Sequence, residues 1–279
     1  MAARNSMLCP NCSRLISADE PRCPHCGLRR PNSPLKRLFG SVGLRDPQQL
    51  VYRVIGVNVV MYVLAILLNP ASTSMAANLF TFLAPDDRSL LLLGMTGKVP
   101  IDRFGRWWSL LAANYLHSGI LHIFFNMVAF RQLAPLVIRE YGTYRMFAIY
   151  TLGGTAGFLV SYLVGIGFTI GASAAVCSLI GAALYFGKSR GGSYGMAIYR
   201  QVGTWVVVLF IFGFLVPGIN NWGHGGGLVF GALLGYLLGY EESKRERLPH
   251  RVLGALCLFA TVAVLLWSVV TSFAFRFLG

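Results

Sequence analysis

Residues 220–239 read NNWGHGGGLVFGALLGYLLG, and this stretch determines how its neighbours must pack. It is mostly apolar and long enough to cross a bilayer, which takes about 20 residues. Glycine recurs at every fourth position, at Gly223, Gly227, Gly231, Gly235 and Gly239. Small residues at this spacing let the backbones of two membrane helices approach closely. The stretch therefore predicts a membrane helix that presses against another helix, with His224 near its beginning.

The whole chain has the composition of an integral membrane protein. Its 279 residues are 55% hydrophobic and only 12% charged, whereas a soluble domain carries about 25% charged residues. This composition excludes a single soluble globule, a disordered chain and a coiled coil. Seven apolar runs are long enough to span a bilayer, namely 51–68, 116–138, 144–165, 168–187, 202–218, 222–240 and 252–275.

The distribution of basic residues predicts the orientation of these spans. Of the 24 Lys and Arg residues, 19 fall on the side of the N-terminus and five on the opposite side. The positive-inside rule then predicts a cytoplasmic N-terminus and an extracytoplasmic C-terminus. No signal peptide is expected, because residues 1–30 lack an apolar h-region. With no organelle-targeting segment either, we expect a multi-pass protein of a bacterial inner membrane.

The long connection at 69–115 differs from the other loops. It contains the pair Trp107–Trp108, and tryptophan is enriched at membrane interfaces. The part from Asp86 to Trp108 is too polar to span a bilayer. We expect it to lie in the interface as a re-entrant or partly embedded structure.

Acidic residues are missing from all seven predicted spans. An aspartyl intramembrane protease needs two carboxylates at membrane depth, so this class is excluded. A proton-coupled transporter usually keeps one carboxylate there, which disfavours this class too. A zinc intramembrane protease is excluded as well, because the chain has no H-E-x-x-H motif. Another small-molecule transporter would show inverted repeats and a broken-helix site, and neither is clear in this sequence.

The polar residues at membrane depth are instead His, Ser and Asn. His117, His122 and Asn126 begin the second span, Ser173 opens the fourth and His224 opens the sixth. Because alternate spans enter from the same side, these clusters should lie together near the extracytoplasmic surface. With no acid nearby, Ser173 as nucleophile and His224 as general base would form a dyad. His122, Asn126 and the Ser173 N–H are suitable donors for an oxyanion.

These residues resemble the motifs of the rhomboid family of intramembrane serine proteases, over roughly residues 50–245. The family's H-x4-H-x3-N, G-x-S-G and His-plus-G-x3-G motifs are matched by His117, His122 and Asn126, by Gly171, Ala172 and Ser173, and by His224, Gly227 and Gly231. The resemblance implies the same four roles, with Ser173 as nucleophile, His224 as base, and His122 and Asn126 as oxyanion donors. It also implies transmembrane proteins as substrates.

The resemblance further implies an all-α polytopic fold, with a six-helix core and one additional C-terminal transmembrane helix, the 6+1 form. We divide the chain into a zinc-ribbon-like module at 1–30, a basic juxtamembrane linker at 31–50, a protease core at 51–245, and the additional helix at 246–279. The linker is expected to anchor the protein at the surface of the lipid bilayer.

Three positions depart from the family pattern. Ala174 replaces the glycine after the nucleophile, and Cys177 stands where an aromatic residue commonly stacks on the catalytic histidine. The Trp-Arg pair of the first loop appears as Trp108–Ser109, with Arg106 displaced. These changes leave a second interpretation open, in which the protein is a catalytically silent rhomboid-like protein that binds membrane-protein clients. The reactivity of Ser173 distinguishes the two interpretations.

The N-terminal module contains the pattern C-x2-C-x10-C-x2-C, formed by Cys9, Cys12, Cys23 and Cys26. Two such pairs suit a tetrahedral structural Zn²⁺ site, and a segment this short would fold only with its metal. A pair of disulfides is disfavoured by the predicted cytoplasmic location, and His25 is interpreted as a bystander. The module resembles a minimal zinc ribbon. No basic or aromatic face favours nucleic acid, and docking of a cytoplasmic partner stays an open hypothesis.

Overall fold

The computed structural model describes residues 6–9, 14–25, 27–33, 46–74, 82–216, 218–243 and 246–277. The chain divides into two compact units, Met1–Leu50 and Val51–Gly279. In the first unit, strands β1 (Ser6–Leu8) and β2 (Leu15–Ser17) pair antiparallel, with Met7 opposite Ile16. This hairpin is the predicted position of the N-terminal module.

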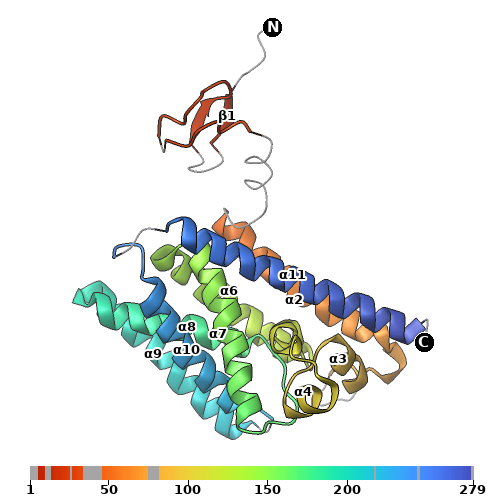
Figure 1. Ribbon diagram of the computed structural model, residues 1–279. Coiled ribbons are helices and arrows are strands. Elements are labelled where there is room, and N and C mark those ends of the chain that lie inside the picture. The colour runs from red at the N-terminus through yellow and green to blue at the C-terminus, as the bar shows by residue number, and fades with distance from the viewer. Residues whose placement is uncertain are drawn as a thin grey trace. The chain divides into compact units, whose positions relative to one another are not determined.

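The second unit is a helical bundle in which each of the seven predicted apolar runs coincides with a long helix (Figure 1). These helices are α2 (Pro47–Leu68), α6 (Ile120–Tyr141), α7 (Thr143–Leu163), α8 (Ser173–Arg190), α9 (Gly192–Leu215), α10 (Asn221–Leu238) and α11 (Leu248–Phe277). The protein is thus an all-α, polytopic membrane protein. Among the described residues, five helices are long and apolar enough to cross a membrane, namely α2, α6, α7, α9 and α11.

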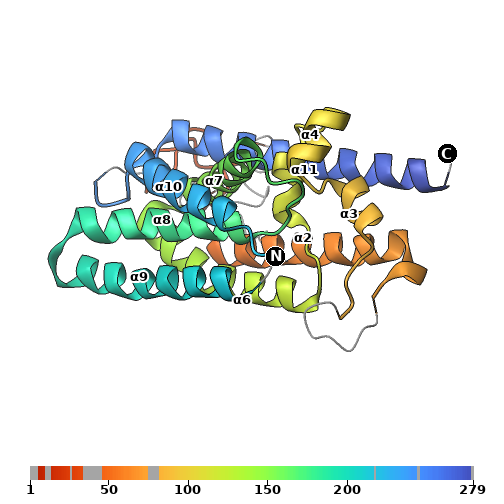
Figure 2. The same cartoon turned by 90° about the horizontal axis from the view of Figure 1, so that it is seen from below.

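The other two predicted spans, α8 and α10, are 18-residue helices; α8 is largely buried in the bundle, whereas α10 buries a glycine face and exposes large apolar side chains. Seen from below, α8 lies between α9 and α10 (Figure 2). Small residues let α8 and α10 pack closely against each other. The sequence marks this contact by the glycines of α10, whose other face carries exposed large apolar side chains such as Val229, Leu233 and Leu237.

The contact between α8 and α10 is made through backbone atoms, as the glycine repeat predicts. A Cβ added at Gly227 would overlap the carbonyl oxygen of Ala174, and one at Gly231 would overlap that of Ser178. A Cβ at Gly181 of α8 would likewise overlap the carbonyl oxygen of Leu228. Because no side chain fits between them, the two helix backbones are held at a fixed, short separation.

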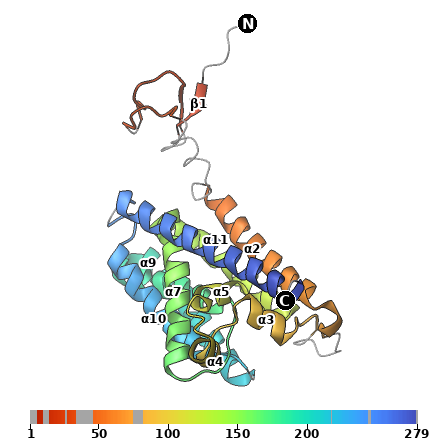
Figure 3. The same cartoon turned by 45° about the vertical axis from the view of Figure 1, so that its right-hand side comes forward.

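The described parts of the long connection after α2, residues 69–74 and 82–115, contain short helices. They are η1 (Pro70–Ser72), α3 (Asp87–Leu93), α4 (Lys98–Phe104), α5 (Ser109–Ala112) and η2 (Ala113–Tyr115). Asp86 caps α3 by accepting a hydrogen bond from the Ser89 N–H. Gly94 and Gly105 end α3 and α4 in the left-handed region, with φ of 110° and 63°. Figure 3 shows α3, α4 and α5 grouped beside α7 and α11.

The C-terminal helix α11 packs against α7 and against the short helices α3 and α5. The Ser268 hydroxyl donates to the carbonyl of Leu93 at the end of α3, at 2.5 Å. Gly254 allows the start of α11 to approach α7, because a Cβ there would lie 2.8 Å from the Tyr144 carbonyl oxygen. The additional helix is therefore an integral part of the bundle.

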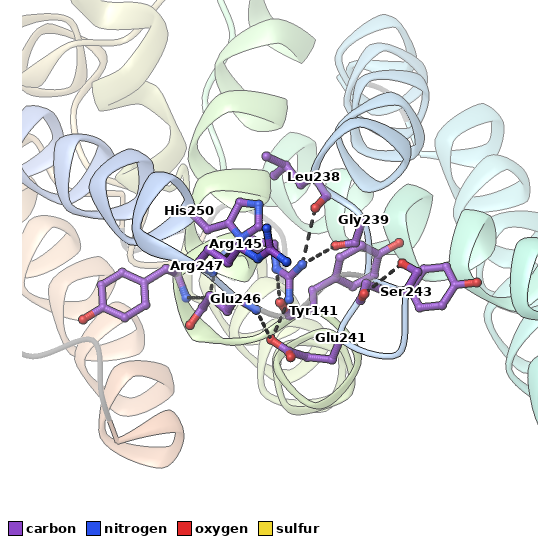
Figure 4. A network of polar contacts seen from close by, with 11 residues as sticks. Tyr141, Arg145, Leu238, Gly239, Glu241, Ser243, Glu246, Arg247 and His250 are labelled. Atoms are coloured by element: carbon purple, nitrogen blue, oxygen red, sulfur yellow. Dashed lines mark hydrogen bonds and ion pairs between the residues drawn. The ribbon is translucent and has the colours of Figure 1, made fainter. Parts of the chain in front are cut away.

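One end of the bundle is closed by a charged network around Arg145, which is completely buried (Figure 4). Its guanidinium donates to the carbonyls of Leu238 and Gly239 at the end of α10, and forms an ion pair of 2.5 Å with Glu241. The Glu246 carboxylate accepts hydrogen bonds from the N–H groups of Tyr144 and Arg145 at 2.9 and 3.2 Å. The network thus joins the start of α7 to the segment between α10 and α11.

Candidate active site

Ser173 is the first residue of α8 and follows a glycine with an unusual backbone conformation. Gly171 has φ of +124°, and its N–H donates to the Ala113 carbonyl at 2.9 Å. Only glycine adopts this conformation without strain. A Cβ there would lie 2.6 Å from His122 Nε2. The glycine therefore turns the chain into α8 and leaves room for the His122 ring beside Ser173.

His224 lies in the first turn of α10, and its Nε2 is 2.8 Å from the Oγ of Ser173. The two residues are 51 positions apart and come from different helices. The backbone contact between α8 and α10 at Gly227, one turn further along α10, holds them at this distance. The structure thus brings together the two residues that the sequence predicts as nucleophile and base.

His224 has no acidic partner in the part of the chain that the structure describes. Its Nδ1 is buried and has no hydrogen-bond partner there. The ring also lines a small crevice with Cys177, Phe210 and Leu228, which has room for about one water molecule. The arrangement around Ser173 is therefore a Ser–His pair and not a triad.

His122 begins α6 and points its Nε2 toward Gly171 and Ser173. Its Nδ1 is 3.3 Å from the Ser118 N and 3.0 Å from the Ser118 Oγ. Because a backbone N–H only donates, Nδ1 must be the acceptor, and in the neutral ring the proton is then assigned to Nε2. His122 Nε2 and Ser173 Oγ both lie within 4 Å of the Cβ position built at Gly171. His122 is therefore oriented as a hydrogen-bond donor beside the nucleophile.

Asn126 and His117 both contact His122. The Asn126 side chain is buried and donates to the His122 carbonyl at 2.8 Å, so one of its N–H groups is used within α6. His117 precedes α6 by three positions and is completely buried, and its ring packs edge-on against that of His122 with centroids 5.0 Å apart.

Two residues with a positioning role were not predicted. Ser118 fixes the tautomer of His122, and Asn220 caps α10 by accepting a hydrogen bond from the Gly223 N–H at 2.9 Å. An asparagine three residues before glycine at the beginning of a helical run is a typical N-cap signal, so the role of Asn220 could have been found. The contact of Ser118 with His122 depends on a turn that spacing does not reveal.

The predicted zinc ligands are only partly within the described residues. Cys9 and Cys23 are buried together with Ile16, while Cys12 and Cys26 lie outside the described residues. The Cys9 N–H donates to the Arg14 carbonyl and the Cys23 N–H to the Leu28 carbonyl, each at 2.9 Å. Among the described residues, no group of three or more His, Cys, Asp or Glu side chains could hold a metal ion. Two of the four predicted ligands, Cys9 and Cys23, thus lie in one buried cluster.

Residues 105–241 match the family model described as the Rhomboid domain. This segment is therefore similar to the Rhomboid domain. It contains the Ser173–His224 pair, His122, Asn126 and the two closely packed helices α8 and α10. The assignment agrees with the resemblance seen in the sequence motifs.

Several relatives of this chain carry the same family name. The chain is 36% identical over 160 residues to the rhomboid protease GluP of Bacillus subtilis, an alignment that covers 56% of this chain and 30% of GluP. It is 29% identical over 158 residues to RHOMBOID-like protein 4 of Arabidopsis thaliana, covering 56% of this chain and 40% of that protein. The putative rhomboid protease YdcA of B. subtilis is 28% identical over 143 residues, covering 50% of this chain and 72% of YdcA. The chain thus matches about a third of the length of GluP and RHOMBOID-like protein 4.

The residues that depart from the family pattern are accommodated inside segment 105–241. Ala174 is buried, and its Cβ lies 3.1 Å from the position that a Cβ would take at Gly157 of α7. Cys177 is buried one turn below Ser173, at the crevice beside His224. Arg106 donates to the Leu91 carbonyl at 2.6 Å and lies 6.0 Å from the Trp108 ring. The hydrogen bond between Ser173 and His224 is present together with all three changes.

Proposed function

We propose that this protein is an intramembrane serine endopeptidase that cleaves peptide bonds in or near the transmembrane segments of other membrane proteins. The observation that carries the proposal is the 2.8 Å contact between Ser173 Oγ and His224 Nε2. This distance falls in the range over which a general base takes the proton of a nucleophile. The names of GluP and YdcA, a rhomboid protease and a putative one, support the same reaction class.

The reaction begins when Ser173 Oγ attacks the scissile carbonyl carbon and its proton passes to His224 Nε2. The tetrahedral intermediate collapses when the C–N bond breaks and His224 returns that proton to the leaving amine nitrogen. An acyl ester on Ser173 remains, and a water molecule activated by His224 hydrolyses it in the second half of the reaction. In this scheme His224 acts alone as base and then as acid in each half of the reaction.

We propose that three donors stabilise the oxyanion of the intermediate. His122 Nε2–H points to the side of Ser173 that faces Gly171. The Ser173 N–H belongs to the first turn of α8, where backbone N–H groups have no acceptor within the helix. Asn126 would contribute its second N–H, because the first donates to the His122 carbonyl. Preorganised donors of this kind usually supply the largest share of the rate acceleration.

The substrate must present an extended segment at a site that water can reach. Ser173, Gly171 and the start of α10 lie at the ends of helices, which places them near one surface of the bundle. We propose that this surface is extracytoplasmic, with the N-terminus in the cytoplasm and the protein in a bacterial inner membrane. Helical substrates hide their carbonyls, so residues that destabilise a helix are expected near the cleavage site.

Proteolysis of a model substrate tests this function. Purified protein is reconstituted with a single-span substrate, and cleavage is compared among wild type, Ser173→Ala and His224→Ala. We expect cleavage by wild type and a loss of at least about 10³-fold in both variants. Cleavage that persists in folded Ser173→Ala would contradict the proposal. The absence of cleavage by wild type against a panel of substrates would favour the silent, client-binding alternative.

We propose that the N-terminal module binds one structural Zn²⁺ through Cys9, Cys12, Cys23 and Cys26. The joint burial of Cys9 and Cys23 around Ile16 supports this site at two of its four ligands. Elemental analysis of the purified full chain should find about one zinc per protein. The variant Cys9→Ser/Cys23→Ser should lose the zinc, whereas the control Cys177→Ser/Cys257→Ser, which changes buried thiols of α8 and α11, should keep it. Zinc retained without Cys9 and Cys23 would contradict the proposal.

A further inference from the structure

Asn220, the residue before α10, uses its whole side chain in hydrogen bonds. Its Oδ1 accepts from the Gly223 N–H at 2.9 Å, and its Nδ2 donates to Ser161 Oγ at 2.7 Å and to Thr169 Oγ1 at 2.8 Å. Its carbonyl also accepts from the His224 N–H at 3.1 Å. One residue therefore connects the first turn of α10, the end of α7 and the segment before α8.

The two hydroxyl acceptors of Asn220 are themselves fixed. Ser161 is completely buried, and its hydroxyl donates to the Gly157 carbonyl at 3.1 Å. Thr169 exchanges both backbone hydrogen bonds with Thr96, at 2.7 and 3.1 Å. Because neither acceptor is free to move, a bond to them fixes the position of Asn220 rather than merely satisfying its amide.

The placement of Asn220 relates it to both residues of the reacting pair. Thr169 lies four positions before Ser173, and Asn220 lies four positions before His224. The side chain of Asn220 thus holds the helix turn that carries the base against the segment that leads into the nucleophile. We propose that Asn220 is a positioning residue that sets the separation of His224 Nε2 and Ser173 Oγ, an inference that rests on the proposed function.

The neighbouring Asn221 provides a matched control. It has the same side chain and also makes one hydrogen bond to another helix, from its Nδ2 to the Gly213 carbonyl of α9 at 2.9 Å. That bond leads away from the segment before Ser173. A comparison of the two asparagines therefore separates a link to the nucleophile from a general link between helices.

The first experiment measures how fast a fluorophosphonate probe reacts with full-length protein in detergent, as a function of probe concentration. We expect Asn220→Ala to lower the maximal rate by about 10²-fold with little change in half-saturating concentration, because a small misplacement affects the chemical step. Thr169→Val, which removes one acceptor and leaves α10 intact, should give a smaller fall. Asn221→Ala should change the maximal rate least of the three.

The proposal is overturned if Asn220→Ala and Asn221→Ala lower the maximal rate equally, or only in proportion to their thermal stability. Hydrogen–deuterium exchange supplies a readout that needs no activity. Exchange over residues 221–224 should accelerate in Asn220→Ala and stay close to wild type in Asn221→Ala. If the probe does not label the wild type, this counts against the proposed function alone. If the hydrogen exchange of residues 221–224 is the same in Asn220→Ala as in the wild type, the positioning role is overturned.

Discussion

The two ends of the helical bundle are built from opposite kinds of polar groups. At one end, Ser173 is the first residue of α8 and His224 lies in the first turn of α10, and the polar residues around them, such as His122 and Asn220, are neutral amide or imidazole groups. At the other end, α10 finishes and α7 begins around the buried guanidinium of Arg145, with the carboxylates of Glu241 and Glu246 beside it (Figure 4). The same helices α7 and α10 run between these ends.

The ends also differ in how completely their polar atoms are paired. The Nε, Nη1 and Nη2 atoms of Arg145 each donate a hydrogen bond to an oxygen acceptor. In contrast, both ring nitrogens of His117 and the Nδ1 of His224 are buried without a partner among the described residues. An unpaired buried polar group costs about 1–3 kcal/mol. The polar atoms of the Arg145 side chain are therefore paired, whereas these three histidine nitrogens are not.

Removal of Arg145 should give the largest loss of stability. Arg145→Leu removes the guanidinium donor from the Glu241 carboxylate and from the carbonyls at the end of α10. Removing one partner of a fully buried pair costs about 3–5 kcal/mol. Because the Glu241 side chain is 36% exposed, we expect a fall in the temperature of unfolding in detergent that corresponds to the lower end of this range. The control Arg190→Leu removes the more exposed ion pair with Glu242 at the same end. Equal shifts for the two variants would contradict the comparison.

The contact between α8 and α10 should be the next most sensitive feature. A Cβ at Gly231 overlaps the Ser178 carbonyl, so Gly231→Ala must push the helices apart. Overpacking typically costs about 1–3 kcal/mol, and the rate of substrate cleavage should fall with it because Ser173 and His224 sit on these two helices. The control is Gly225→Ala in α10, since a Cβ at Gly225 has no atom within 4 Å. Its unfolding temperature should stay the same or rise. A tolerated Gly231→Ala would show that the helix separation is not critical.

The smallest expected effect concerns the pH dependence at the charged end. Burial raises the pKa of the Glu246 carboxyl above its ordinary value of 4.5, against the opposite influence of the Arg145 and Tyr144 N–H groups. A raised pKa contributes stability below 4.5 that is lost as the pH rises through the folded-state pKa. Glu246→Gln keeps an acceptor but does not titrate. Its unfolding temperature relative to wild type should therefore increase between about pH 4 and pH 7. A difference that is constant or decreases with pH would contradict this assignment.

Much of the bundle could be predicted from the sequence because membrane helices are marked by length and hydrophobicity. The repeat from Gly223 to Gly239 also predicted a close helix contact, and the structure shows that α8 is the partner. The sequence could not reveal that 69–115 folds into short helices, because none of them is longer than seven residues. Periodicity is not measurable over so few positions.

The candidate site was predictable to the extent that its residues belong to spaced motifs. Ser173, His224 and His122 were found in this way, and the structure places all three around Gly171 and the start of α8. The charged end was missed, although Arg145, Glu241 and Glu246 are plain in the sequence. Their pairing joins residues about 100 positions apart, and such contacts follow from the packed bundle rather than from local spacing.

The most direct test of the account is the identity of the residue that an activated-serine probe modifies. Full-length protein in detergent is treated with a fluorophosphonate, digested and mapped by mass spectrometry, with His224→Ala and a known active rhomboid protease treated alongside. We predict one adduct, on Ser173 of the wild type, and none in folded His224→Ala. An unmodified wild type beside a labelled reference enzyme, or an adduct on Ser173 that persists without His224, would contradict the claim that His224 activates Ser173.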